Sequence, residues 1–235
     1  MKVYFVSGLA ADRRVFKHIK LPPGYEIIHL DWIAPSNKES LEDYSSRLSE
    51  KIVPGEPFAL LGLSMGGMIV SEISRQYAIK KKDKPIITIL LSSVPVSQHL
   101  PAHFKLARSL RLYKFVPVKF LKSASFFNRF FSSDNKEDKA ILNQVIQDSD
   151  PGFIRWAMQA VLEWKNEILP KPLVHIHGTK DRILPARYTK PTHLIDKASH
   201  LMVMSRAKEL NLLISEALLS VSLTSVTFTL QPGGS

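Results

Sequence analysis

One serine stands in the spacing that a catalytic nucleophile requires. The segment Gly62-Leu63-Ser64-Met65-Gly66-Gly67 follows an apolar run and precedes a helical pattern, which places a G-x-S-x-G motif between a strand and a helix. A serine in this tight turn needs small residues two positions away on each side. We expect Gly62 and Gly66 to give that clearance, Gly67 to let the helix pack close to the strand, and the helix N-terminus to favour negative charge at Ser64.

The competing interpretation is a glycine-rich turn that a serine happens to cap. The chain has only 10 glycines, so chance assembly of this motif between a strand and a helix is rare. The sequence therefore favours Ser64 as a nucleophile.

A serine nucleophile needs a base, and the base needs an acid to orient it. The strand-like run Leu173–Gly178 is followed by Asp181, and the run Thr192–Ile195 is followed by His200. Side chains that follow parallel strands emerge at one edge of the sheet, which is the edge expected for Ser64. Asp196 is nearer to His200 in sequence, but it ends a strand and is poorly placed to reach Nδ1. We therefore predict Asp181 as the acid and His200 as the base.

Attack on a carbonyl also needs N–H donors for the developing oxyanion, each worth about 10²–10³ in kcat. One predicted donor is the amide of Met65, the residue after the nucleophile. The second is the amide of Leu9, in the Ser7-Gly8-Leu9 loop after the first apolar run. The alternative for this loop is a plain turn, but its place between a strand and a helix expected at Arg14–Ile19 favours the donor.

Two further histidines raise a different chemistry. His175 and His177 share one face of a predicted strand, as a pair of metal ligands does. No third ligand is evident in the sequence, so we expect no metal site.

The elements that must position these residues alternate between two kinds. Helical spacing, as in Leu41, Tyr44 and Leu48, separates short apolar runs. This alternation predicts an α/β fold, a doubly wound and mostly parallel sheet with helices on both faces. The six runs are Val3–Val6, Tyr25–Leu30, Phe58–Leu63, Pro85–Leu91, Leu173–Ile176 and Thr192–Ile195.

The alternation of strands and helices stops between residues 95 and 170, where helical patterns, prolines and aromatic residues replace strands. We therefore expect residues 1–94 and 171–220 to form the core and residues 95–170 to form a helical insertion. Residues 221–235 are rich in serine, threonine and valine, and we expect them to form a tail or an edge strand.

Composition bounds the function. The 235 residues hold no cysteine, which excludes disulfides, thiol catalysis and cysteine-ligated zinc. No apolar run approaches the ~20 residues of a membrane span, and the N-terminus lacks signal-peptide features, so we expect a cytoplasmic protein. The formal net charge of +11 fits a solvated basic surface better than attraction to an anionic partner. No nucleic-acid-binding motif is present.

Together these segments resemble the α/β-hydrolase superfamily from about Val3 to Leu219. The turn at residues 62–67 is similar to the elbow of small esterases, residues 177–185 to the acid-bearing segment, and residues 199–204 to the histidine segment. The resemblance implies a catalytic triad, no cofactor, and a cap formed by residues 95–170 over the substrate pocket.

Three departures from the family limit that resemblance. Ser7 stands where the family often has a histidine. This change need not affect the backbone N–H that we expect to donate to the oxyanion. The family's usual first two strands are missing, which leaves a sheet of about six strands. A serine at position 64 argues against epoxide hydrolases and haloalkane dehalogenases, which attack with a carboxylate.

We therefore expect a serine hydrolase that cleaves carboxylic esters with a small to medium, mostly apolar part, through an acyl-enzyme. One alternative is a thioesterase for anionic acyl carriers, because the part of the insertion from 103 to 131 interleaves basic and aromatic residues without an acid. Another is a binding protein that keeps the fold without turnover. The basic residues of this segment are Lys105, Arg108, Arg111, Lys114, Lys119, Lys122 and Arg129.

Overall fold

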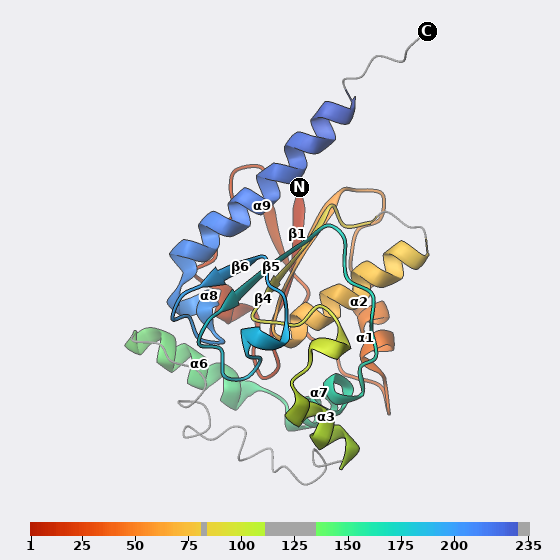
Figure 1. Cartoon of the computed structure of the whole chain (residues 1–235), viewed down its shortest axis with the longest axis vertical. Coiled ribbons are helices and arrows are strands. Elements are labelled where there is room, and N and C mark those ends of the chain that lie inside the picture. Colours follow the sequence, from red (N-terminus) through yellow and green to blue (C-terminus); the bar gives the residue numbers. More distant parts are fainter. Residues whose placement is uncertain (81–83, 111–134, 230–235) are drawn as a thin grey trace.

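The computed structural model describes residues 1–80, 84–110 and 135–229, with side chains described as far as residue 221. In this part of the chain, six parallel strands form one sheet in the order β2-β1-β3-β4-β5-β6 (Figure 1). Every predicted apolar run becomes a strand, which confirms the parallel-sheet prediction. The strands are β1 (Lys2–Val6), β2 (Glu26–His29), β3 (Phe58–Leu63), β4 (Ile87–Leu91), β5 (Leu173–Gly178) and β6 (His193–Ile195).

Helices fill most of the connections between these strands. The α-helices are α1 (Leu41–Ser49), α2 (Met65–Ile79), α3 (Ala102–Ser109), α6 (Lys136–Asp148), α7 (Pro151–Glu163), α8 (Met202–Ser205) and α9 (Ala207–Thr229). Short 3₁₀ turns are η1 (Arg13–Phe16), η2 (Ser97–His99) and η4 (Ala186–Tyr188).

The sheet divides the core into two layers, because successive strand residues point to opposite faces. On β1, Val3 and Phe5 pack in a cluster with α6 and α9, whereas Tyr4 and Val6 pack with α1, α2 and α7. All six residues of β3 are buried. Burial on both faces explains why this strand is a continuous apolar run in the sequence.

Helix boundaries follow from local capping. The Ser40 side chain accepts a hydrogen bond from the Asp43 amide at the start of α1, and Asp150 accepts one from the Phe153 amide at the start of α7. Pro151 occupies the first turn of α7, where its missing N–H costs nothing.

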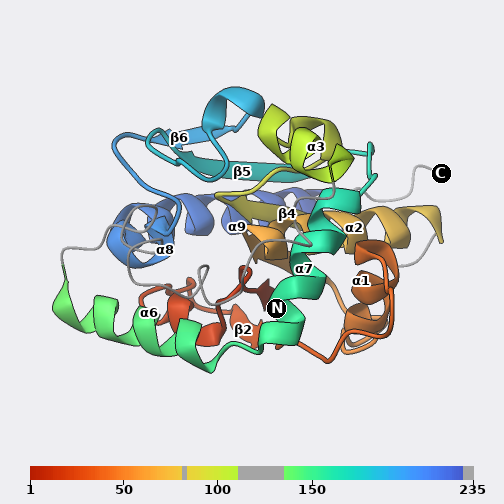
Figure 2. The same ribbon diagram turned by 90° about the horizontal axis from the view of Figure 1, so that it is seen from below.

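Between β4 and β5, the described residues form helices and no strand, and residues 111–134 of the predicted insertion lie outside the described residues. Helices α3, α6 and α7 lie on the same lower side of the molecule in Figure 1, and Figure 2 shows them in front of the sheet when it is viewed from that side. Leu106 and Leu110 at α3 are more than half exposed, whereas Phe104 of the same helix packs against the core.

Two local expectations about helix positions were wrong. The helix expected at Arg14–Ile19 is the short 3₁₀ turn η1, with Asp12 as its N-cap. Helix α2 begins at Met65, directly after the serine, and not at Met68.

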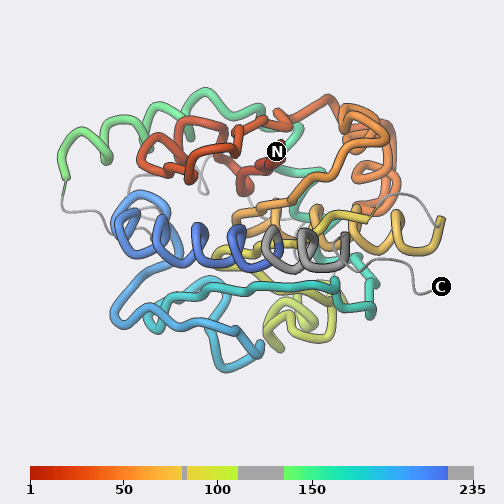
Figure 3. Tube along the Cα trace, turned by 90° about the horizontal axis from the view of Figure 1, so that it is seen from above, coloured from red at the N-terminus to blue at the C-terminus, as the bar shows by residue number. Residues whose placement is uncertain are grey.

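The edge strand considered for residues 221–235 is contradicted as far as residue 229, because α9 runs from Ala207 to Thr229. Extending an existing helix costs far less than starting one, which outweighs the weak helix propensity of serine, threonine and valine. Figure 3 views the molecule from the side opposite to Figure 2 and shows α9, in blue, running along it.

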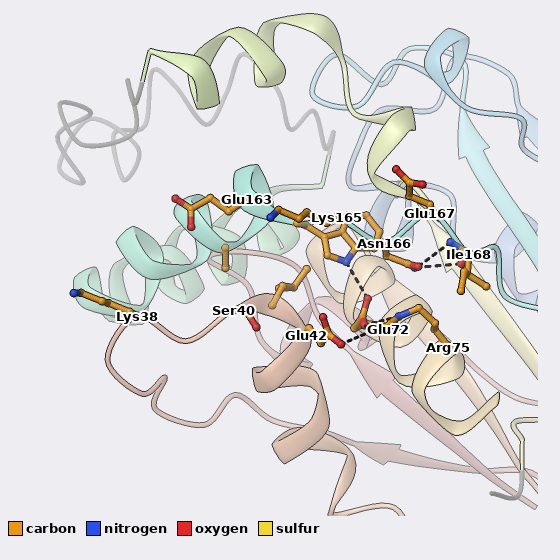
Figure 4. A pocket seen from close by; sticks show the side chains of 13 residues that line it. Lys38, Ser40, Glu42, Glu72, Arg75, Glu163, Lys165, Asn166, Glu167 and Ile168 are labelled. Atoms are coloured by element: carbon orange, nitrogen blue, oxygen red, sulfur yellow. Dashed lines mark hydrogen bonds and ion pairs between the residues drawn. The ribbon is translucent and has the colours of Figure 1, made fainter. Parts of the chain in front are cut away.

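A buried ion pair anchors α7 to the core. The Glu72 side chain on α2 is 1% exposed, and its carboxylate accepts hydrogen bonds from Arg75 and, at 3.1 Å, from the Trp164 indole at the end of α7. Arg75 also bonds the exposed Glu42 at 2.6 Å (Figure 4). The pair thus links α1, α2 and the end of α7.

Replacing Glu72 with leucine should destabilise the fold, because it leaves the Trp164 N–H and the mostly buried Arg75 without their carboxylate. We expect the free energy of unfolding in urea to fall by about 3 kcal/mol for Glu72→Leu. The exposed partner offers a control, since Glu42→Ala should cost less than about 1 kcal/mol. Equal small losses for the two variants would contradict the anchoring role.

Candidate active site

Ser64 lies in a strained turn between β3 and α2. Its φ of 54° and ψ of −119° are unusual for a residue with a side chain, and such a conformation costs of order 1–3 kcal/mol. Three hydrogen bonds hold it: the Ser64 amide donates to the Leu91 carbonyl at 3.0 Å, and the Ser64 carbonyl accepts from the Gly67 amide at 2.9 Å and the Ser93 hydroxyl at 2.6 Å. The surrounding structure therefore imposes the turn on the serine.

The clearance expected at the three glycines is present. A Cβ on Gly62 would lie 2.3 Å from the Gly66 carbonyl oxygen, and one on Gly66 would lie 2.2 Å from the Ser7 carbonyl oxygen. A Cβ on Gly67 would meet the Ser93 hydroxyl at 2.3 Å. Larger residues at these positions would force the backbone apart, because none of the contacts is with the end of a long flexible side chain.

The structure brings Ser64, His200 and Asp181 into one hydrogen-bonded chain. His200 Nε2 is 2.8 Å from Ser64 Oγ, and His200 Nδ1 is 2.7 Å from Asp181 Oδ2. Ser64 follows β3, Asp181 follows β5 and His200 follows β6, so all three come from the carboxyl ends of parallel strands. His200 and Asp181 are buried, at 3% and 4% exposure.

Asp181 is kept ionised by its neighbours. Burial opposes its charge, but the adjacent His200 and His177 rings outweigh burial and hold the pKa of the Asp181 carboxyl well below its usual value. Oδ1 also accepts the amides of Ile183 and Leu184, both at 2.9 Å. Because the carboxylate can only accept, His200 Nδ1 carries the hydrogen, and the Nε2 lone pair faces Ser64 Oγ.

The two predicted oxyanion donors are Met65, which directly follows the serine, and Leu9, in a turn close to it. Met65 is the first residue of α2, so its N–H has no carbonyl within the helix to bind. The turn that carries Leu9 is close, since a Cβ on Gly8 would lie 3.3 Å from Ser64 Cβ. The Ser7 hydroxyl donates to the Ala11 carbonyl at 3.0 Å, which fixes this turn from inside.

A cavity of 380 Å³ opens against the same turn. Trp32 and Phe153 give it aromatic walls, and the Trp32 indole is anchored at 2.7 Å to the Ala11 carbonyl. Its remaining lining residues are Ala10, Ala11, Asp12, Ile33, Ala34, Pro35, Val145, Asp148, Ser149 and Asp150.

A larger cavity of 630 Å³ lies elsewhere, around the Glu72–Arg75 ion pair between α1, α2 and the end of α7 (Figure 4). None of the predicted site residues lines either cavity, but Ala10 and Ala11 of the 380 Å³ cavity belong to the turn that carries Leu9. The cavity beside this turn is therefore the better candidate for a substrate.

Within the described residues, no group of three histidine or acidic side chains is arranged to hold a metal ion. His175 and His177, considered as a metal pair, instead bond each other at 3.0 Å. No helix in the described part of the chain is long and apolar enough to cross a membrane.

Sequence reasoning missed two residues that act at this site. Ser93 holds the Ser64 carbonyl, and His177 Nε2 lies 3.2 Å from Asp181 Oδ2. The only sequence signal for His177 was its two-residue spacing from His175. Of the basic residues between 103 and 131, Lys105 and Arg108 are on α3, and the others lie outside the described residues.

A family model described as "Alpha/beta hydrolase family" matches residues 3–211. No curated protein matches the sequence.

Solved structures share the fold at low sequence identity. A thermophilic esterase from Thermogutta terrifontis has a TM-score of 0.69 at 20% identity, over 94% of this chain and 90% of its own. An enol-lactonase from Burkholderia xenovorans LB400 has a TM-score of 0.71 at 16% identity, over 93% and 91%. The RedJ thioesterase from the prodiginine pathway of Streptomyces coelicolor has a TM-score of 0.63 at 14% identity, over 90% and 84%.

These likenesses agree with the parallel sheet and its flanking helices. The family match covers most of the chain. The chain therefore belongs to the alpha/beta hydrolase family.

Proposed function

We propose that this protein is a serine hydrolase that cleaves carboxylic esters with Ser64 as nucleophile, His200 as base and Asp181 as orienting acid. The hydrogen-bonded chain from Ser64 Oγ through His200 to Asp181, at 2.8 and 2.7 Å, is the observation that carries the proposal. The order of the three residues along the sequence is the one usual in this family.

In the proposed reaction, Ser64 Oγ attacks the ester carbonyl while His200 Nε2 takes the hydroxyl proton. The amides of Leu9 and Met65 donate to the resulting oxyanion. Collapse of the intermediate breaks the bond to the alcohol, which leaves with the proton from His200, and the acyl group stays on Ser64. A water, deprotonated by His200, then releases the acid and restores the serine. Every step uses groups of this chain and water.

The cavity beside the Leu9 turn is our candidate for the apolar part of the substrate. Its 380 Å³ lies at the small end of the range for ligand pockets. Arg14 bonds Asp12 at 2.6 Å and Asp148 at 2.8 Å, which offsets two of the acids at its rim. Asp150 is occupied as the N-cap of α7. These contacts favour an uncharged substrate of small to medium size.

We further propose that α3, α6 and α7 act as a cap over this pocket. Val145 of α6 and Phe153 of α7 line it from the insertion, opposite Ala10 and Trp32 of the core. Movement or replacement of α6 and α7 would therefore change which substrates fit.

Thioester cleavage is the second candidate, because the same residues would attack a thioester. Lys105 and Arg108 stand on α3 beside the exposed Leu106, a combination that suits an acyl chain on an anionic carrier. The two candidates differ in their response to salt. Turnover of an anionic acyl thioester that falls steeply with salt, while a neutral ester is unaffected, would favour the thioesterase.

Labelling with a fluorophosphonate tests the nucleophile directly. We expect intact mass to show one adduct per chain in the wild type and none in Ser64→Ala, and ester turnover to fall by about four orders of magnitude or more in that variant. A folded wild-type protein that takes no label would contradict the proposal and favour a binding protein without turnover.

Replacing Asp181 with asparagine should leave the fold in place and lower kcat by about 10⁴, because an amide stabilises the wrong tautomer of His200. Because the pKa of Asp181 is held below its usual value, the carboxylate is ionised across the working pH range. Protonation of Asp181 is therefore expected to take no part in the loss of wild-type activity on the acid side. A kcat/KM profile that falls with two protons would contradict this assignment.

The pocket can be narrowed at Ala34, an exposed residue at its rim. We expect Ala34→Phe to raise KM about tenfold for p-nitrophenyl hexanoate and to leave KM for the acetate nearly unchanged, since a lost fit of this kind is worth 1–3 kcal/mol. Ala140→Phe, at an exposed position on α6 outside the cavity, is the matched control. Identical chain-length profiles for the two variants would place the substrate elsewhere.

A further inference from the structure

Two histidines are fully buried on one face of β5. The side chains of His175 and His177 are both at 0% exposure, and His175 Nε2 is 3.0 Å from His177 Nδ1. Neither residue takes part in the reaction proposed above. A buried polar pair is costly unless its hydrogen bonds are satisfied, so the contacts of the pair indicate what it does.

The second nitrogen of His177 points at two acceptors. His177 Nε2 is 2.6 Å from the Leu184 carbonyl and 3.2 Å from Asp181 Oδ2. Neither the carbonyl nor the ionised carboxylate can donate, so Nε2 carries the hydrogen and donates. His177 Nδ1 is then the acceptor for the His175 Nε2–H. The hydrogen bonds around the ring thus define its tautomer.

His175 is held neutral. Burial and then the neighbouring His177 lower the pKa of His175 to about 3, with a smaller contribution from His99. Its Nδ1 has no hydrogen bond of ordinary geometry among the described residues, although an interaction with the Ser93 backbone partly opposes the fall in its pKa. A buried nitrogen without a good hydrogen bond costs of order 1–3 kcal/mol, a cost that an apolar residue on this strand would avoid. The short polar contact that histidine gives here, and an apolar residue does not, is the donor to His177.

The geometry points to His177 as a positioning residue for Asp181, with His175 as the residue that fixes its tautomer; this inference rests on the proposed function. The Nε2–H of His177 is a second ring donor to the same oxygen, Oδ2, that receives His200 Nδ1 at 2.7 Å. It also closes the turn from residue 181 to 184 through the Leu184 carbonyl. Asp181 is thereby held from behind while it faces His200.

The arrangement has an electrostatic consequence with a definite sign. A donor to Oδ2 takes up part of the carboxylate charge, which weakens the attraction between Asp181 and a protonated His200. Loss of that donor should make the pair bind its proton more tightly. The titratable groups that face His177 are His175 on its own strand, Asp181 on the following loop, and His200 across that carboxylate.

The test compares His177→Leu, which removes the donor, with His177→Gln, whose amide keeps an N–H donor on a side chain of similar reach. We expect kcat for a neutral ester to fall about 10–100-fold in His177→Leu with KM unchanged, and to recover largely in His177→Gln. His29→Leu is the matched control, because His29 is a partly buried strand histidine on β2, packed on Phe5 and Phe16. It should leave kcat as in the wild type.

A second readout needs no substrate. NMR titration of ¹⁵N-labelled histidine in the unliganded protein should move the midpoint of the His200 signal to higher pH in His177→Leu, and back toward the wild-type midpoint in His177→Gln. If esters are not turned over but this shift is seen, the proposed function fails and the positioning role stands.

An unchanged His200 midpoint and an unchanged kcat in folded His177→Leu would overturn the inference and leave the pair a packing feature. If that variant does not fold, His175→Leu carries the same test, since it removes only the donor that fixes the His177 tautomer. It should shift the midpoint in the same direction by a smaller amount. No shift in that folded variant would equally overturn the inference.

Discussion

The arrangement of the site depends on one buried carboxylate. Asp181 is 4% exposed, and four N–H groups meet its two oxygens: the Ile183 and Leu184 amides at Oδ1, and the His200 and His177 rings at Oδ2. A charge at this depth is tolerable only because each of these donors compensates for lost water. The same contacts fix the turn after β5, the tautomer of His200 and therefore the lone pair that faces Ser64.

The parallel sheet brings these groups together from distant parts of the sequence. Each loop that carries a site residue leaves the carboxyl end of a strand, so β3, β5 and β6 deliver three distant parts of the sequence to one edge. Of the three residues, only Ser64 has a strained backbone, at a φ of 54°. Close packing of Gly62, Gly66 and Gly67, together with the Ser93 hydroxyl, keeps it in that conformation. The packing around the turn thus maintains its strained geometry.

Much of this arrangement was predictable because it is written in local patterns. Continuous apolar runs such as Phe58–Leu63 predict strands buried on both faces, and a glycine spacing around Ser64 predicts a turn of one shape. Once the strands are assigned, the position of Asp181 and of His200 after two of them follows from the topology.

The remaining features depend on contacts that no local pattern encodes. Strand periodicity puts His175 and His177 on one face, but only the packed structure shows that His175 contacts His177 and that His177 contacts Asp181. No motif in the sequence marks Ser93, although its hydroxyl reaches the Ser64 carbonyl. Residues 221–229 have weak helix propensity, but they are helical because they continue a helix that is already formed.

The central claim is that Ser64 forms a covalent acyl-enzyme during turnover. The most direct measurement is rapid mixing of the protein with p-nitrophenyl butyrate, acid quenching at intervals, and mass analysis of the intact chain and its peptides. The account predicts that a butyryl group appears on Ser64 before the steady state and disappears when the ester is exhausted. Ester hydrolysis at the full rate with no acyl group on Ser64 at any interval, or with one on another residue, would contradict it.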